Sequence, residues 1–273
     1  MEPGASRAAH SFCVFTALFL AGPAQAEDEP YNGQDPTRPV TRVDLRYQYQ
    51  NAPPPTRDDV GIVTLRADKG FGLGKGWTLA MRVDAPFISN EFVTRDNLHG
   101  ERHTGAGDLL VQGLLIKAES PSFAWAVGAQ AIFPTASEDG LGNGKYRLVP
   151  TIGVGTRTPS LGESAWAAAL LRYDFDVAGK DDRRHISELQ FAPMVNIPLP
   201  RYWFVNLYPS TDIRYNFMAE RPGDTGKWFV PFNFMVGRML DRVTVASVEM
   251  GIPVVNDYKV YDFKLEARIG RFF

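Results

Sequence analysis

The sequence predicts an all-β fold, a transmembrane antiparallel β-barrel of about twelve strands. Three observations carry this prediction: an alternating C-terminus, an N-terminal export signal and a series of strand-like segments that recur about every 20 residues. The barrel is expected over residues 41–273, after a signal peptide over residues 1–26 and a flexible segment over residues 27–40.

The C-terminal segment alternates most clearly between apolar and charged residues. Four charged residues separate its apolar positions, which are Tyr261, Phe263, Leu265, Ala267, Ile269 and finally Phe273. A period of two places the apolar side chains on one face of a strand and the charged ones on the other. Because charged side chains are costly against lipid, we expect the apolar face to meet the membrane and the charges to face a lumen.

Residues 1–26 have the features of a secretory signal peptide. Arg7 precedes an apolar run over residues 12–21, and a small-residue site at 24–26 and three acidic residues follow. The run is shorter than the roughly 20 residues that a spanning helix needs. Cleavage after Ala26 would also remove Cys13, the single cysteine, so neither disulfides nor cysteine chemistry is expected in the mature chain.

Composition narrows the class further. The formal net charge of −2 leaves no basic excess for binding nucleic acid. A soluble β-sandwich or lipocalin-like barrel would also alternate. Its strands, however, average about 5–6 residues, whereas the segments here are long enough for a tilted membrane crossing.

The first four expected strands differ in clarity. Segment 41–50 sets Val, Leu and Tyr against Arg, Asp and Gln, and segment 77–87 alternates equally well. Segment 59–67 is less regular, and segment 108–117 is more apolar overall.

The next four segments continue the pattern. Segment 123–133 alternates aromatic residues or Val with Ala, Gly and Gln, and segment 145–157 sets apolar residues against Lys, Arg and Thr. Segment 164–176 carries Arg and Asp on one face, and segment 185–197 places apolar residues opposite Glu, Gln and Asn.

The last four segments complete an even number of strands, as bacterial barrels require. They are 202–216, 228–238, 243–254 and 260–273. If both termini are periplasmic, the gaps that face outside are polar and mostly long. Most of the other gaps are tight, although those at 68–76 and 157–163 are longer than turns usually are.

Several motifs resemble those of a known family. They are Gly105-Ala106-Gly107-Asp108-Leu109, Phe133-Pro134-Thr135 with the glycine-rich stretch 140–146, Trp228-Phe229-Val230-Pro231, and the aromatic C-terminus. Together they resemble the outer-membrane family named for the meta-pathway of phenol degradation, whose relatives often carry the label "neuromedin U". The resemblance spans most of residues 41–273. It implies an outer-membrane barrel of the transporter and porin group, in the Gram-negative cell envelope, and supplies no catalytic residues.

The C-terminus also resembles the signal that the barrel-assembly machinery reads, which makes that machinery and outer-membrane lipid the expected partners. The residues of this signal are Tyr261, Phe263, Leu265 and Phe273.

The charged faces of the expected strands form the main candidate site. The residues expected to line a pore are Asp44, Arg46, Arg82, Asp84, Arg147, Arg172, Asp174, Glu188, Asp212, Arg214, Glu249, Lys264, Glu266 and Arg268. The function expected is passive transport of small molecules, aromatic or apolar ones as the family name suggests, without a cofactor, a metal or a catalytic step. The same charges could instead pair into a network that fills the barrel.

Two other functions remain open at this point. Ser187 and His185 lie two apart on one strand face and could serve as nucleophile and base of an outer-membrane lipid hydrolase. A non-conducting barrel could instead bind a partner through its loops 88–104 and 217–227.

Two further motifs predict no chemistry. The glycine-rich stretch 140–145 lacks a Walker loop's first Gly and its final Ser or Thr. His99 and His103 are four residues apart, but they lie in an expected loop rather than on a helix.

Overall fold

The computed structural model describes residues 32–51, 59–91, 101–209, 213–219, 226–257 and 260–273. Within these residues the chain forms fourteen β-strands and two short 3-10 turns. The first seven strands are β1 (Arg42–Asn51), β2 (Asp59–Gly74), β3 (Trp77–Glu91), β4 (Arg102–Ala106), β5 (Leu109–Ser120), β6 (Phe123–Phe133) and β7 (Lys145–Arg157). The others are β8 (Trp166–Gly179), β9 (Ser187–Leu199), β10 (Trp203–Leu207), β11 (Ile213–Asn216), β12 (Trp228–Met239), β13 (Thr244–Asn256) and β14 (Phe263–Phe272).

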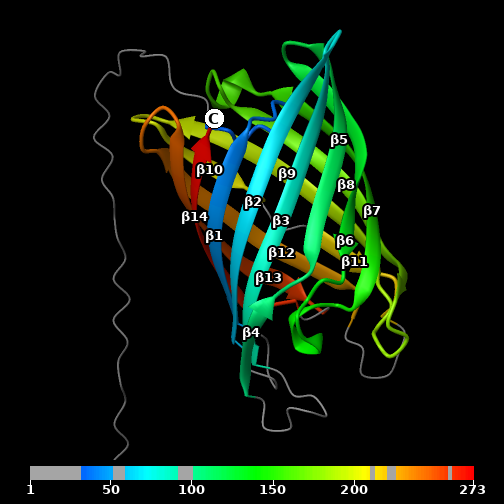
Figure 1. Cartoon of the computed structure of the whole chain (residues 1–273). Coiled ribbons are helices and arrows are strands. Elements are labelled where there is room, and N and C mark those ends of the chain that lie inside the picture. The colour runs from blue at the N-terminus through cyan, green and yellow to red at the C-terminus, as the bar shows by residue number, and fades with distance from the viewer. Residues whose placement is uncertain (1–31, 52–58, 92–100, 210–212, 220–225, 258–259) are drawn as a thin grey trace, which may run out of the picture.

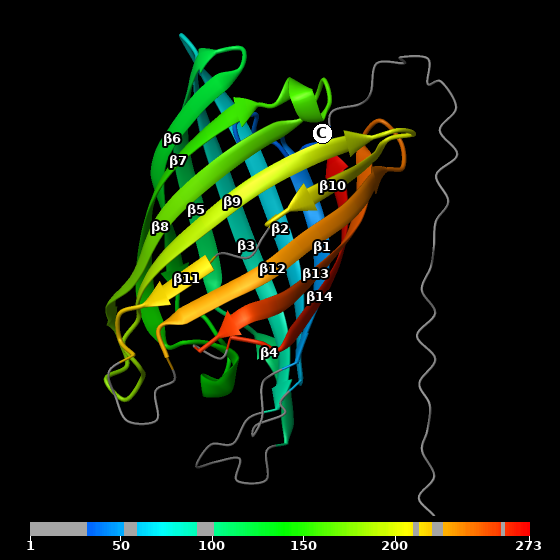
Figure 2. The same ribbon diagram turned by 180° about the vertical axis from the view of Figure 1, so that it is seen from behind.

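The strands close into one antiparallel barrel (Figures 1 and 2). Both β4 and β5 pair with β3, and both β10 and β11 lie between β9 and β12. Each of these two pairs fills one position in the wall, so the fourteen described strands make twelve wall positions. Ten consecutive residue pairs between β1 and β14 close the ring. The prediction of an antiparallel barrel of about twelve strands is confirmed.

The barrel has two unlike ends, which we call the turn end and the loop end. The turn end holds the start of β1, the C-terminus, the short connections that follow β2, β5, β9 and β12, and the eight-residue connection that follows β7. The loop end holds the connections that follow β1, β3, β6, β8, β11 and β13, which are mostly longer, and the connections β4–β5 and β10–β11 lie within the wall. Long loops at one end and short turns at the other are typical of outer-membrane barrels.

One connection is tighter than the sequence suggests. The gap expected at 68–76 is a two-residue turn, because β2 continues to Gly74 and β3 begins at Trp77. Lys75 and Gly76 both have positive φ angles, of 51° and 76°. Two such residues favour the type I′ turn that joins antiparallel strands most closely.

The single strand expected over residues 202–216 is in fact two strands. β10 ends at Leu207, Tyr208 has a positive φ of 51°, and Pro209 follows. A non-glycine residue in the left-handed region and a proline without an N–H both interrupt a strand ladder. The expected strand 108–117 differs in another way, because β4 precedes it on the same edge of β3.

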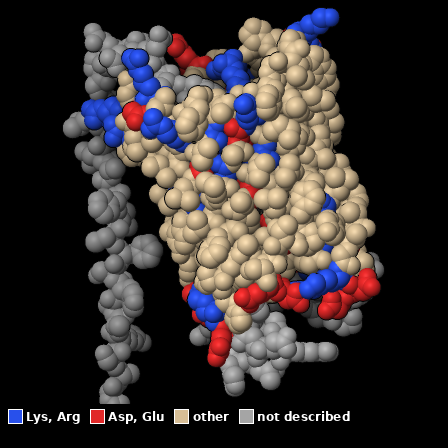
Figure 3. All heavy atoms as spheres, in the orientation of Figure 1, with Lys and Arg blue, Asp and Glu red and all other residues tan. Residues whose placement is uncertain are grey.

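The outer face of the wall is apolar. In β1 the outward Val43, Leu45 and Tyr47 are 40–52% exposed to the space outside the barrel. Figure 3 shows uncharged residues over most of one outer face, with Asp and Glu gathered at the loop end. The Trp77 and Trp125 rings pack edge to face at the turn end, with 5.4 Å between the ring centroids. Aromatic residues at this level are typical of the interface between lipid and water.

In the described part of the chain, no helix is both long and apolar enough to cross a membrane.

Candidate functional site: the barrel lumen

The densest group of charges lies on the inward face of β14, β1, β2 and β3. Arg42 contacts Asp44 at 3.1 Å and Asp68 at 2.8 Å. Asp68 also accepts a hydrogen bond from Arg82 at 2.7 Å. The guanidinium of Arg66 donates two hydrogen bonds to Asp84, at 2.7 and 2.5 Å. Each carboxylate in this group is therefore held by at least one arginine.

The same network continues onto β14 and β13. Arg46 reaches Glu266 at 2.8 Å, and Arg268 lies 4.0 Å from Asp44. Lys264 contacts Glu249 at 2.5 Å, and both side chains are nearly inaccessible, at 3% and 1% exposure. Asn233 of β12 donates to the same carboxylate at 2.8 Å.

Three members of this network are absent from the predicted pore lining: Arg42, Arg66 and Asp68. Arg66 and Asp68 lie on β2, whose expected range ended at residue 67 and whose alternation is interrupted by the inward Ile62. The spacing of two between Arg66 and Asp68 is the signal that could have extended the polar face of this strand.

A second group of charges lies on the opposite part of the wall, on β7, β8, β9 and β11. The guanidinium of Arg147 donates two hydrogen bonds to Asp174, one of them at 2.9 Å from Nε. Gln190 also donates to Asp174, at 3.2 Å. Arg214 lies 3.8 Å from Glu188. Arg172 sits between Thr151 and Gln190 in register, and Asp212 lies outside the described residues.

Most ion pairs of both groups join neighbouring strands, whereas Arg42 and Asp44 both lie on β1. The Arg42–Asp68 pair links β1 to β2, Arg46–Glu266 links β1 to β14, and Arg147–Asp174 links β7 to β8. These pairs therefore run along the wall of the barrel, and each one ties together two strands that also share backbone hydrogen bonds.

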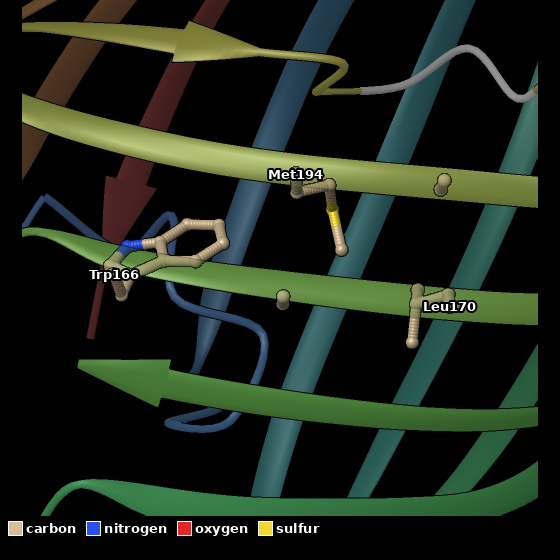
Figure 4. Close-up of a cluster of buried hydrophobic side chains, with 5 residues drawn as sticks. Trp166, Leu170 and Met194 are labelled. Carbon is tan, nitrogen blue, oxygen red and sulfur yellow. The ribbon is translucent and has the colours of Figure 1, made fainter. Parts of the chain in front are cut away.

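Apolar side chains cover much of the inward wall towards the turn end. Trp166, Ala168 and Leu170 of β8 pack with Ala192 and Met194 of β9 (Figure 4). They occupy the same alternating positions as Arg172 and Asp174 of β8, and thus share the inward face with them. Two further buried clusters lie on other strands, around Ile116 of β5 and Phe204 of β10.

The described part of the N-terminal segment, residues 32–41, lies against the inward wall at the turn end. Asn32 donates a hydrogen bond to Asn196 of β9 at 3.1 Å, and Arg42 donates to the carbonyl of Gly33 at 3.0 Å. A Cβ on the inward Gly155 of β7 would lie 2.3 Å from Thr37 Cγ2. Figure 4 shows the segment, in blue, passing between these strands and the far wall. It therefore narrows the turn end of the lumen.

A folded loop, residues 134–144, lies at the loop end of the barrel. Asp108 accepts hydrogen bonds from the backbone N–H groups of Ala136 and Asn143, at 3.3 and 2.7 Å. Thr135 donates to the carbonyl of Gly107 at 3.0 Å. Lys180 forms an ion pair with Asp139 in the same loop. The pKa of Asp139 is lowered, chiefly by the hydrogen bond from Lys180.

The residues of the expected C-terminal assembly signal differ in orientation. Leu265 and Phe273 point outward, at 40% and 77% exposure, and Phe263 is half-buried at the start of β14. The expectation that Tyr261 also faces lipid is wrong, because its side chain is 1% exposed and packs edge to face on Phe229. Tyr261 precedes β14, so the alternation of that strand does not determine its direction.

Ser187 and His185, the expected nucleophile and base, each have another side chain as hydrogen-bond partner. The hydroxyl of Ser187 lies 2.7 Å from the hydroxyl of Tyr173, and Nδ1 of His185 lies 2.9 Å from Asp176. His103 lies 2.5 Å from Glu138, whereas His99 lies outside the described residues. The described residues contain no group of three or more His, Cys, Asp or Glu that could hold a metal ion.

A family profile matches the chain over most of the barrel. The profile described as "Putative MetA-pathway of phenol degradation" matches residues 54–230. The chain belongs to this family. The matched residues run from the connection after β1 to the start of β12, and they include the loop that Asp108 holds. A search among curated proteins finds no match to the chain.

Solved structures share the fold of this family member. The COG4313 outer membrane channel from Pseudomonas putida F1 aligns with a TM-score of 0.66 and 11% identity, over 92% of this chain and 100% of that one. The NanC porin aligns with a TM-score of 0.58 and 14% identity, over 85% of this chain and 99% of that one. The outer membrane phospholipase A from Escherichia coli aligns with a TM-score of 0.50 and 9% identity, over 90% of this chain and 94% of that one. Two of the three names place the protein in the outer membrane, and the third names a porin.

Proposed function

We propose that this protein is an outer-membrane channel through which small molecules, aromatic or apolar ones among them, pass by diffusion. The outer-membrane location is part of the proposal, and the named barrels with the same fold support it. Their identities of 11% and 14% relate the folds alone.

The observation that carries the proposal is the distribution of polar and apolar residues on the inward wall. Charged residues pair along the wall in one zone, and buried apolar clusters line the turn end. A path with both kinds of surface suits solutes that combine an apolar body with a polar group. Charged and apolar linings of this kind are the means by which pores select solutes.

A pair of neighbouring alanines provides a sharp test. Ala168 faces the lumen in the apolar cluster of β8, and Ala169 is the next residue, on the opposite face of the strand. The mature chain, residues 27–273, would be refolded and inserted into a planar bilayer, and single-channel currents would be recorded.

We expect discrete conductance steps, and we expect benzyl alcohol to interrupt them more than glucose does. Ala168→Trp should lower the conductance because it narrows the lumen, whereas Ala169→Trp should leave it unchanged. Circular dichroism and the gel shift of folded barrels would verify that both variants fold. A folded barrel without conductance, or equal currents in the two variants, would reject the proposal.

A further inference from the structure

A small cavity lies at the loop end of the lumen, where Arg147, Glu188 and Arg214 of the second group of charges form part of its lining. Its volume is about 260 Å³, and its walls come from β7, β9, β11 and the connections before β7 and before β9. Four arginines contribute to the lining: Arg147, Arg183, Arg184 and Arg214. Glu188 is the single carboxylate among the lining residues.

The fold brings these arginines together from three separate parts of the chain. Arg147 lies on the inward face of β7, and Arg214 lies on the inward face of β11, beside Gln190 of β9. Arg183 and Arg184 belong to the connection between β8 and β9. Asp176 holds that connection by accepting a hydrogen bond from the backbone N–H of Ile186 at 2.6 Å.

Existing ion pairs hold three of the four arginines in place. Arg147 is held by Asp174, Arg214 lies 3.8 Å from Glu188, and Arg183 contacts Asp139 of the folded loop. A guanidinium has five N–H donors in a planar fork, more than one carboxylate partner can accept. Each arginine can therefore hold its partner and still present donors to a solute in the cavity.

The side chains remain accessible from the cavity. Those of Arg183 and Arg214 are 27% and 29% exposed, and that of Arg147 is 14% exposed. Donors that are partly desolvated and held in position form stronger hydrogen bonds to an anion than fully hydrated ones.

We infer that this cavity binds the carboxylate of a small organic acid, with the apolar body of the acid directed into the lumen. The inference rests on the proposed function, which it extends by naming a class of solute. Arginine forks match a planar carboxylate in two-point contact. The presence of Glu188 disfavours a dianion such as inorganic phosphate, and the apolar clusters beyond the charged zone suit a hydrocarbon body.

The test measures binding directly, on the mature chain in detergent micelles by isothermal titration calorimetry. Benzoate is the probe, benzamide its uncharged counterpart of the same shape, and inorganic phosphate the competing anion. The combined variant Arg184→Gln and Arg214→Gln removes two cavity charges. Arg242→Gln, in the exposed turn after β12 at the other end of the barrel, is the matched control.

We expect benzoate to bind about tenfold more tightly than benzamide or phosphate, as one charge-assisted contact implies. The combined variant should lose about tenfold in affinity for benzoate, and Arg242→Gln should lose none. Arg184→Gln alone, in a connection outside the strands, keeps the test valid if the combined variant does not fold. Equal binding of benzoate and benzamide, phosphate binding as tight as benzoate, or full affinity in a folded arginine variant would overturn the inference.

This result and that of the conductance experiment are separable. Binding in micelles does not require an open lumen. Arginine-dependent binding of benzoate without any conductance would uphold this inference and reject the proposed channel. Conductance steps without arginine-dependent binding would do the reverse.

Discussion

The carboxylate of Asp108 holds the loop 134–144 in place, since its Oδ2 accepts a hydrogen bond from the backbone N–H of Asn143 at 2.7 Å. Its Oδ1 accepts another from Ala136, at 3.3 Å, so one side chain joins both parts of the loop. Two motifs that lie apart in the sequence, around Asp108 and around Asn143, thus form a single structure at the loop end of the barrel.

Replacing Asp108 should release this loop. Asp108→Ala removes both acceptors and leaves two backbone N–H groups without them. We expect faster proteolysis within residues 134–144 and a loss of about 2 kcal/mol in the free energy of unfolding. Limited proteolysis and denaturant unfolding in micelles would measure both effects. Glu163→Ala, in an exposed turn at the other end, is the control, and equal cleavage rates in the two variants would contradict the role of Asp108.

Gly142, in the same loop, should not tolerate an added side chain. A Cβ on Gly142 would lie 2.4 Å from Asp108 Oδ1 and 2.5 Å from Ala136 Cβ, whereas a Cβ on Gly72 would meet nothing within 4 Å. Gly142→Ala should therefore displace the loop and lower the melting temperature, and Gly72→Ala should leave it nearly unchanged. Thermal melting of both variants, monitored by circular dichroism, would test this difference. Similar curves would mean that the loop adapts to the added methyl group.

Acid should loosen the loop as well. The pKa of Asp139 is lowered in the folded protein, chiefly by the hydrogen bond from Lys180. A carboxyl with a lowered pKa stabilises the fold above its ordinary pKa of about 3.9, and this contribution is lost as the pH falls through the lowered value. Hydrogen exchange of residues 134–144, corrected for the intrinsic effect of pH, should therefore accelerate below about pH 4.

The control for this pH effect is Asp139→Asn. Its exchange at neutral pH should already match that of the acidified parent, because the ion pairs with Lys180 and Arg183 are absent. The role of Asp139 would be refuted if hydrogen exchange in the unmodified protein did not change with pH once the intrinsic effect of pH is removed.

Removing one partner of the buried Lys264–Glu249 ion pair should destabilise the fold strongly. Both side chains are almost inaccessible and 2.5 Å apart. Lys264→Met leaves the Glu249 charge buried without its cation, and we expect a loss of about 3–5 kcal/mol in the free energy of unfolding. Adding Glu249→Gln should restore part of that loss, because the uncompensated charge is then gone.

The matched control for this pair is Lys69→Met. Lys69 lies on the outer face of β2, with its ammonium 5.1 Å from the centre of the Phe71 ring. Unfolding in urea with lipid or detergent present would compare the variants. If Lys264→Met costs no more than Lys69→Met, the pair does not stabilise the barrel.

Much of the fold was predictable because strand alternation is a local property. Charged residues in β1 and β14 recur every second position, and lipid on one side leaves them only one direction to face. The even number of strands and the contrast between long and short connections followed from the same pattern. The places where this reasoning was wrong are strand ends and breaks, as at Tyr208 and Tyr261, where backbone angles and a neighbouring ring decide the direction of the chain.

The sequence by itself determined the class of fold, the approximate strand count and which face of most strands is charged, since these depend on residues two apart. Only the tertiary structure decided which charges meet. Arg66 pairs with Asp84 and Lys264 with Glu249 because register sets neighbouring strands side by side. The arginine-lined cavity likewise needs three segments far apart in the chain to converge at one end of the closed barrel. Such contacts depend on barrel closure and on the register between strands, which the alternation within a single strand does not specify.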